Sequence, residues 1–126
     1  PESARRLCLP CWMILKQFLQ MKIVYNNILP VKGFTAMNLF GIIFARNEYK
    51  PLARRIQNHE AIHTVQMKEM LYIFFYLWYL VEWLVKLFRY GRNAYENISF
   101  EREAYTYQYD YSYLEKRKKY HWIKRL

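Results

Sequence analysis

The uncharged segment that begins at Met70 most constrains how this chain can fold. Residues 70–81 read MLYIFFYLWYLV, and apolar side chains recur through Phe88 at the spacing of an α-helix. The 12 uncharged residues fall short of the roughly 20 that a membrane-spanning helix needs, and Glu82 and Lys86 follow one turn apart. The pattern predicts a helix that is apolar over about two thirds of its circumference.

Three stripes follow this predicted helix. The first apolar stripe holds Leu71, Phe74, Trp78, Val81, Val85 and Phe88. The second apolar stripe holds Ile73, Leu77, Leu80, Leu84 and Leu87. The third, polar stripe holds Glu69, Tyr72, Tyr76, Tyr79, Glu82 and Lys86. Such a helix is expected at the centre of a small core or against a bilayer surface, with its tyrosines at the lipid headgroups, and the two can hold for different faces of the helix.

Short strands are predicted upstream of the helical part. Residues 22–25 form the first, and residues 34–46, FTAMNLFGIIFAR, form one or two more, with a bend at Gly41. The uncharged part near Ala36–Phe44 is a candidate edge strand. These short strands precede helices, so they predict a small sheet at the N-terminal side of the domain.

Two further helical segments complete the prediction. One begins near Ile56 with Asn58 as its N-cap, and it continues through Glu69 into the apolar helix without a break. After a loop, another begins with Ser99 as its N-cap and runs through a tyrosine-rich stretch as far as Lys119. The expected fold class is α+β and mainly helical.

One compact domain is expected over residues 21–126, with residues 1–20 as an N-terminal appendage. The appendage holds a CxxC pair, Cys8 and Cys11. No second CxxC completes a four-cysteine zinc site and no βαβ pattern surrounds the pair, so we interpret it as incidental.

The charge predicts an acidic partner. The net charge is +10 and aromatic residues make up 20% of the chain. Anionic lipid, nucleic acid and an acidic protein surface all fit that charge. Nucleic acid is not favoured, because the basic residues are spread and no base-stacking motif is present. The basic C-terminal end, with Trp122 and Ile123 among its charges, is a candidate lipid contact.

The stretch NHEAIHTVQ, residues 58–66, contains an HExxH motif. On a helix His59 and His63 lie one turn apart, so their imidazoles can converge on one metal ion. Glu60 points to the side of the pair and can reach a water molecule at the metal. The motif therefore predicts two zinc ligands and one general base.

A catalytic zinc site needs a third protein ligand and an open fourth position. His121 lies in the basic tail and is not favoured, which leaves a carboxylate from a second helix. Glu101 and Glu103 are the candidates at the start of the later helix. They lie about 200° apart around a helix, so only one of them can face the metal.

The residues around these candidates resemble gluzincin metallopeptidases. His59 to His63, an apolar segment, and then FEREAY at residues 100–105 are similar to the CaaX prenyl endopeptidase and HtpX-like peptidases and to the β-lactam sensor peptidases. The resemblance implies Zn²⁺ bound by His59, His63 and Glu101, with Ala104 matching the family alanine. The family aspartate falls on Tyr105, a departure from that pattern. The chain also resembles short HExxHxxQ proteins of Bacteroidetes-type bacteria, with Gln66 as the last residue.

The expected function is zinc-dependent peptide hydrolysis, with Glu60 as the general base and a minimal zincin-like fold. Gln66 and Glu103 are expected to hydrogen-bond near the metal, and Tyr105 is a candidate donor to a developing oxyanion. The expected partners are a peptide or protein substrate and an anionic membrane surface, at the cytoplasmic face of a bacterial membrane. The alternative is a non-catalytic module that binds a membrane or a partner, with a structural or vestigial metal site.

Overall fold

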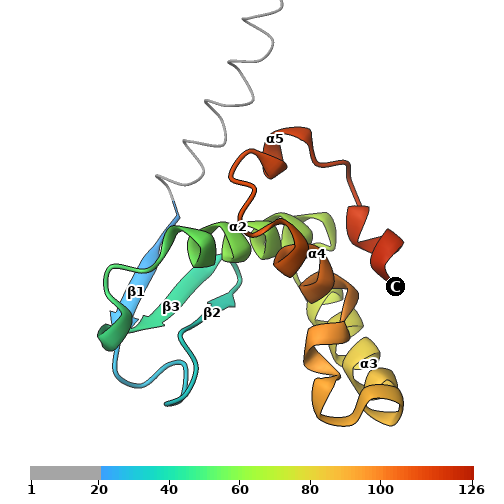
Figure 1. Ribbon diagram of the computed structural model, residues 1–126, viewed down its shortest axis with the longest axis horizontal. Coiled ribbons are helices and arrows are strands. Elements are labelled where there is room, and N and C mark those ends of the chain that lie inside the picture. Colours follow the sequence, from blue (N-terminus) through green and yellow to red (C-terminus); the bar gives the residue numbers. More distant parts are fainter. Residues whose placement is uncertain (1–20) are drawn as a thin grey trace, which may run out of the picture.

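The computed structural model describes residues 21–126, in which a small sheet and a group of helices flank one central helix (Figure 1). The N-terminal appendage predicted for residues 1–20, with Cys8 and Cys11, lies outside the described residues. The predicted α+β class, mainly helical with short N-terminal strands, is confirmed.

The sheet has three strands in the order β1-β3-β2. β1 (Ile23–Asn26) runs parallel to β3 (Ile42–Arg46), and β2 (Ala36–Leu39) runs antiparallel to β3. Phe40 and Gly41 form the tight turn between β2 and β3, both with positive φ, as a two-residue hairpin turn that follows the strand twist requires. The bend predicted at the glycine is therefore confirmed, and β2 lies at an edge of the sheet.

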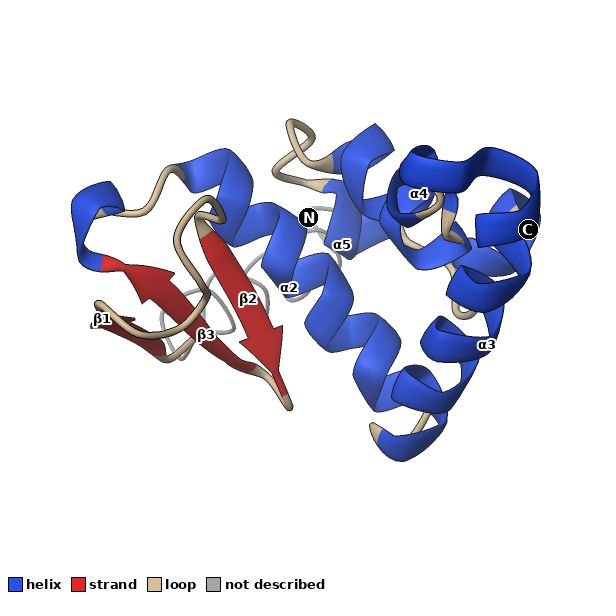
Figure 2. Ribbon diagram, turned by 90° about the horizontal axis from the view of Figure 1, so that it is seen from below, coloured by secondary structure: helices blue, strands red, loops and turns tan. Residues whose placement is uncertain are grey.

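The central helix α2 (Arg54–Glu69) follows a short 3₁₀ turn, η1 (Asn47–Tyr49), and packs along the sheet (Figure 2). The predicted N-cap was wrong. The helix begins at Arg54 after Ala53, and Asn58 is buried inside it. The Asn58 side-chain amide donates instead to the backbone carbonyls of Tyr107, Gln108 and Asp110. This residue therefore ties α2 to the C-terminal segment.

The prediction of one continuous helix was also wrong. α2 ends at Glu69, and α3 (Ile73–Tyr90) begins after a break at which Leu71 and Tyr72 take positive φ values of 52° and 58°. No single helix in residues 21–126 is both long and apolar enough to cross a membrane. The pair Arg54–Glu69 and Ile73–Asn93, bent by 109°, meets that test together, on length and composition alone.

The apolar stripes of α3 do not form the core. Only two residues of the helix are buried, Phe75 and Glu82, while most of both apolar stripes is exposed, with Phe88 at 93%. The polar stripe faces the protein: Tyr76 and Tyr79 pack on the core cluster that contains Met67. The interpretation of this helix as the centre of a small core therefore holds only for the face that carries Phe75, Tyr76 and Tyr79, and it was wrong for the two apolar stripes.

The C-terminal part is made of short elements. Two 3₁₀ turns, η2 (Gly91–Asn93) and η3 (Tyr95–Asn97), lead into α4 (Ser99–Tyr107). α4 ends well before Lys119, and α5 (Tyr113–Lys116) and η4 (His121–Arg125) follow it. The predicted extension of α4 to Lys119 was therefore wrong.

The start of α4 depends on α3. Ser99 is not the N-cap, which is Ile98. The carboxylate of Glu82 instead accepts hydrogen bonds from the Ser99 backbone N–H at 2.7 Å and from the Ser99 hydroxyl at 2.6 Å. Lys86 pairs with the same carboxylate at 2.7 Å. A buried carboxylate at a helix N-terminus satisfies free N–H groups and favours the helix dipole.

Candidate metal centre

α2 and α4 bring His59, His63 and Glu101 together. The two imidazoles project from successive turns of α2 toward the first turn of α4. The Nε2 atoms of His59 and His63 lie 3.1 Å apart, and each lies 3.2 Å from Oε2 of Glu101. All three residues are buried. The structure thus assembles the two histidines of the motif with one of the two candidate glutamates.

The spacing of these three atoms fits a metal ion. Zinc–ligand distances of about 2.0–2.1 Å place the corners of a tetrahedron about 3.3 Å apart. The separations of 3.1, 3.2 and 3.2 Å are close to that edge length. Two histidines and one carboxylate also form a donor set used by catalytic zinc sites. The His59–His63–Glu101 group could therefore hold a metal ion.

Two glutamine side chains orient the histidines. Nδ1 of His63 lies 2.8 Å from Oε1 of Gln66, and Nδ1 of His59 lies 3.1 Å from Oε1 of Gln108. An amide oxygen only accepts hydrogen bonds, so each Nδ1 carries a proton and each Nε2 is left to face Glu101. This is the arrangement that a metal-binding imidazole needs.

The direction of the Gln66 amide is determined by its other contacts. Its Nε2 donates to the backbone carbonyl of Phe100 and to Oε1 of Glu103, both at 3.1 Å. The amide oxygen must therefore be the atom that meets His63. The sequence indicated Gln66 by its position on the histidine face, whereas nothing in the sequence indicated Gln108, which lies beyond the end of α4.

Tyr79 is a further contact that the sequence did not single out. Its hydroxyl donates to Oε1 of Glu101 at 2.9 Å, while Oε2 of the same carboxylate faces the histidines. Burial and the nearby Glu101 carboxylate raise the pKa of Tyr79, so the hydroxyl keeps its proton. The sequence feature that could have indicated it is the polar stripe of α3, which includes Tyr79.

Without a metal, the centre holds a proton. Burial alone would lower the pKa of His63, but the Glu101 carboxylate, with Glu60 and Gln66, raises this pKa to about 9. Burial alone would raise the pKa of Glu101, but the two histidines lower it well below its usual range. A protonated His63 and an ionised Glu101 therefore form an ion pair where a cation would bind.

Glu60 lies beside the three candidate ligands. It is buried, and burial raises the pKa of its carboxyl group although both histidines oppose this. Its backbone carbonyl accepts a hydrogen bond of 2.9 Å from the Asn38 side chain on β2. Glu60 thus belongs both to the helix of the motif and to the contact between that helix and the edge strand.

Glu103 takes a different position from Glu101. It is fully buried and forms a bidentate ion pair with Arg117, at 2.9 and 2.8 Å. Tyr113 donates to it at 3.2 Å, and Arg117 also pairs with Glu69 at the end of α2. Glu103 therefore contacts the centre only through Gln66, and it anchors the C-terminal segment to α2.

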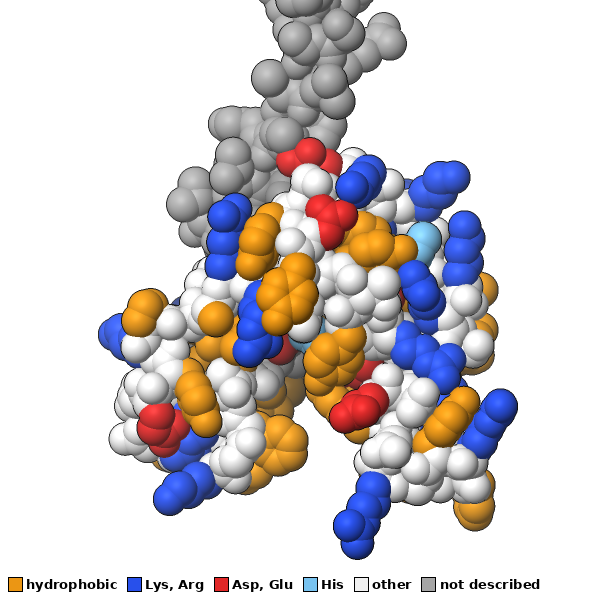
Figure 3. All heavy atoms as spheres, viewed as in Figure 1, with side chains coloured by type: hydrophobic (Ala, Val, Ile, Leu, Met, Phe, Trp, Pro, Cys, Tyr) orange, Lys and Arg blue, Asp and Glu red, His pale blue; other side chains and the backbone are white. Residues whose placement is uncertain are grey.

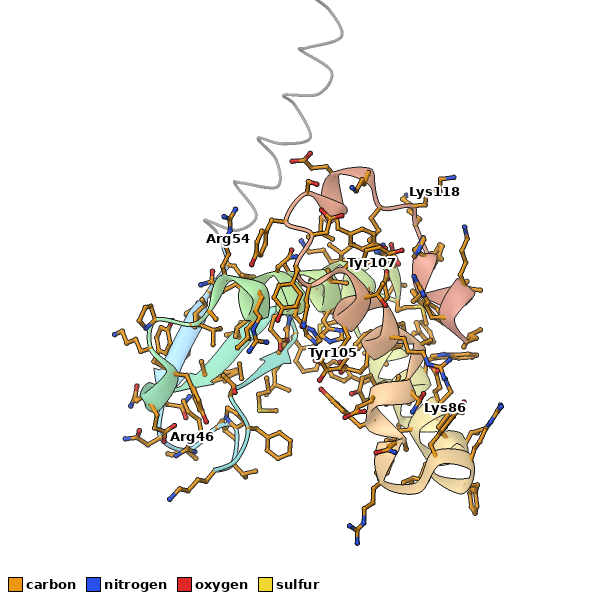
Figure 4. All side chains as sticks on the ribbon, in the orientation of Figure 1. Arg46, Arg54, Lys86, Tyr105, Tyr107 and Lys118 are labelled. Carbon is orange, nitrogen blue, oxygen red and sulfur yellow. The ribbon has the colours of Figure 1, made fainter. Side chains whose placement is uncertain are left out.

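Tyr105 lies against the centre, whereas His121 does not. The ring of Tyr105 packs edge-on against the His59 imidazole, with centroids 4.7 Å apart, and is 44% exposed (Figure 4). His121 lies near the rings of Tyr107 and Tyr113, away from the candidate ligands. The structure thus brings Tyr105 to the histidines and leaves His121 outside.

A cavity of about 450 Å³ opens onto the centre. Its walls come from the loop before β2, from β2 itself and from α3, and Glu60, His63 and Glu101 lie at its polar end. The remaining lining is mostly apolar, including Met37, Leu39 and Phe75. Figure 3 shows a notch along the lower edge of the molecule, between the sheet side and the helical side.

The comparisons with known proteins add no relative. No protein-family model matches the chain, and neither a curated protein nor a solved structure is significantly similar to it. The functional argument therefore depends on the geometry of the centre itself.

Proposed function

We propose that this protein is a zinc-dependent metallopeptidase of minimal zincin-like architecture. The observation that carries the proposal is the convergence of His59 Nε2, His63 Nε2 and Glu101 Oε2 at the edge spacing of a tetrahedron. Both histidines already have their Nδ1 protons held by glutamine oxygens, so their free nitrogens face the same point. Three protein ligands leave a fourth position open, as catalytic rather than structural zinc sites do.

A zinc ion at this position would supply a Lewis acid and a water molecule of lowered pKa. Glu60 is the general base in the proposal. Its carboxylate takes the proton of the attacking water and later delivers it to the leaving amine of the cleaved peptide bond. The raised pKa of Glu60 supports this role, because a base that works near neutrality must be able to hold the proton between the two steps.

The substrate would lie along β2. This strand is at the edge of the sheet, and all four of its residues line the cavity that holds Glu60. An extended peptide can add to such an edge through main-chain hydrogen bonds, while its side chains enter flanking pockets. The apolar walls of the cavity favour a substrate with a large apolar side chain next to the cleaved bond.

Tyr105 is placed to assist this reaction. Its ring packs against His59 at the margin of the centre, and the residue is partly exposed. A phenol at this point could donate to the oxygen of a polarised peptide carbonyl.

The test measures zinc content and peptide cleavage in the unaltered protein and in one variant. Purified protein should contain about one zinc per chain by elemental mass spectrometry, and Glu60→Gln should keep that zinc because Glu60 is not a ligand. Cleavage of a peptide library, mapped by mass spectrometry, should fall by about 10²–10⁴-fold in Glu60→Gln. Glu48→Gln, an exposed glutamate near β3, is the matched control and should cleave as the unaltered protein does.

Two outcomes would contradict the proposal. Cleavage that survives Glu60→Gln would show that another group is the base. Bound zinc with no cleavage of any peptide in the library would identify a structural metal site instead.

A further inference from the structure

The outer face of α3, which lies outside the metal centre, is a large exposed apolar surface. We define it as the nine apolar side chains between Ile73 and Phe88 that are at least 40% exposed. Both apolar stripes contribute to it, and together they form one continuous side of the helix. A soluble monomer rarely exposes a contiguous apolar patch of this kind without a partner.

Two of the three charged residues of α3 are turned the opposite way. Glu82 is only 6% exposed, and Lys86 pairs with it while also donating to the backbone carbonyl of Asn97. The third, Arg89, is exposed at the end of the helix, where it packs over the ring of Tyr90. Along the length of the helix, therefore, the ion pair faces the protein and the apolar side chains face out.

Hydrocarbon is the environment that fits this face best. Protein interfaces taken as a whole are only slightly more than half apolar and carry polar pairs at their rims. From Ile73 to Phe88 the outer face presents no charged side chain.

The charge of the protein identifies the kind of bilayer. The chain carries a net charge of +10, and Arg89 and Arg92 are exposed where α3 ends. Figure 3 shows Lys and Arg side chains at the lower tips on both sides of the notch. Cationic side chains beside an apolar helix face are drawn to anionic headgroups.

We propose that the outer face of α3 inserts into the surface of an anionic lipid bilayer, with Arg89 and Arg92 among the headgroups. The inference is independent of the zinc chemistry, because neither the face nor its test involves the metal centre. A bilayer would cover the apolar side chains of α3 that residues 21–126 leave exposed.

The test is flotation of the full chain with lipid vesicles. Vesicles of phosphatidylcholine with phosphatidylglycerol should carry the protein, and phosphatidylcholine alone should carry at least tenfold less. A variant with Leu77→Gln, Val81→Gln and Phe88→Gln should lose at least tenfold of its binding. The matched control combines Tyr49→Gln with Tyr109→Gln, exposed aromatic residues outside α3, and should bind as the unaltered protein does.

Three outcomes would overturn the proposal, provided that the outer-face variant is folded. Thermal unfolding and far-ultraviolet circular dichroism that match the unaltered protein show that the outer-face variant is folded. Undiminished vesicle binding by that folded variant would overturn the proposal, as would failure of the unaltered protein to float. If the unaltered protein is instead a dimer without lipid and the outer-face variant is a monomer, the face contacts a second copy and the bilayer proposal fails.

Discussion

The consecutive helices α2 and α3 both bury polar side chains, but they differ in where their apolar side chains lie. α2 buries Ala61, Ile62 and Met67, whereas α3 exposes most of its apolar residues. α2 buries the polar residues Asn58, His59, Glu60, His63 and Gln66. α3 exposes its apolar side chains and buries Glu82 with Phe75. The difference shows that polarity alone does not decide which face of a helix is buried. A polar side chain can be buried where it finds hydrogen-bond partners. Four of the five polar side chains of α2, all but that of Glu60, hydrogen-bond within α2, to α4 or to the segment that follows α4.

The largest expected effect is a loss of stability, and it tests whether α3 buries Phe75 and exposes its outer face. Phe75→Ala removes a buried ring and should lower the free energy of unfolding by about 3–5 kcal/mol. Phe88→Ala removes the same ring from an exposed position and should change it by no more than about 0.5 kcal/mol. Urea denaturation of both variants measures the difference. Equal losses would show that the outer face is packed against protein.

The ion pair between Arg117 and Glu103 tests the buried polar contacts of α2. Arg117→Met leaves Glu103 and Glu69 without their cation in a buried site and should cost about 3–5 kcal/mol of unfolding free energy. The neighbouring Lys116 pairs with Asp110 at the surface, so Lys116→Met should cost at most about 1 kcal/mol. The same denaturation assay compares the two, and a small loss in Arg117→Met would mean that the C-terminal segment does not hold α2.

Gln66 tests how the centre depends on oriented histidines. Gln66→Leu removes the acceptor of the His63 Nδ1 proton and should weaken zinc binding about 10–100-fold, measured against a competing chelator. Gln57 on the same helix bonds the Leu52 carbonyl and touches neither histidine, so Gln57→Leu should leave zinc affinity unchanged. Equal affinities in both variants would remove Gln66 from the metal site.

The smallest expected effect is the pH dependence of zinc binding. Because the pKa of His63 is raised to about 9 in the metal-free protein, this imidazole is protonated at neutral pH and must release its proton to bind zinc. Zinc affinity should therefore rise about tenfold per pH unit from pH 7 toward pH 9. Calorimetry in two buffers of different ionisation enthalpy measures the released proton. No proton release at pH 7 would contradict the ion pair with Glu101.

The predictable part of the molecule is local. Short strands, the hairpin bend at Gly41 and the HExxH helix follow from residue spacing and turn chemistry, and all three are present. The paired histidines one turn apart are also a local feature of that helix. The helix boundaries were less predictable, since Asn58 and Ser99 have capping side chains whose partners lie in distant segments.

The packing of α4 on α2, and not the spacing along the chain, determines that Glu101 rather than Glu103 faces the histidines. Both carboxylates lie near the helix start, and spacing shows only that they point apart. The structure turns Glu101 to the histidines because Arg117, 14 residues after Glu103, holds that second carboxylate on the other side. Gln108 and Tyr79 likewise reach the centre from separate segments. Spacing placed Tyr79 on the polar stripe of α3 but did not indicate its contact with Glu101, and it gave no sign of Gln108.

Spacing along the chain decided the short strands, the β2–β3 turn, the motif helix and the amphipathic character of α3, because each depends on neighbours within a few residues. Tertiary structure decided the pairing of β1 with β3, where α2 ends and which face of α3 turns inward. The break at Leu71 and Tyr72 bends α3 by 109° from α2, and the Glu82 contact with Ser99 turns the polar stripe toward α4. A helical period defines two faces, but only the partners of the polar groups determine which of them meets the protein.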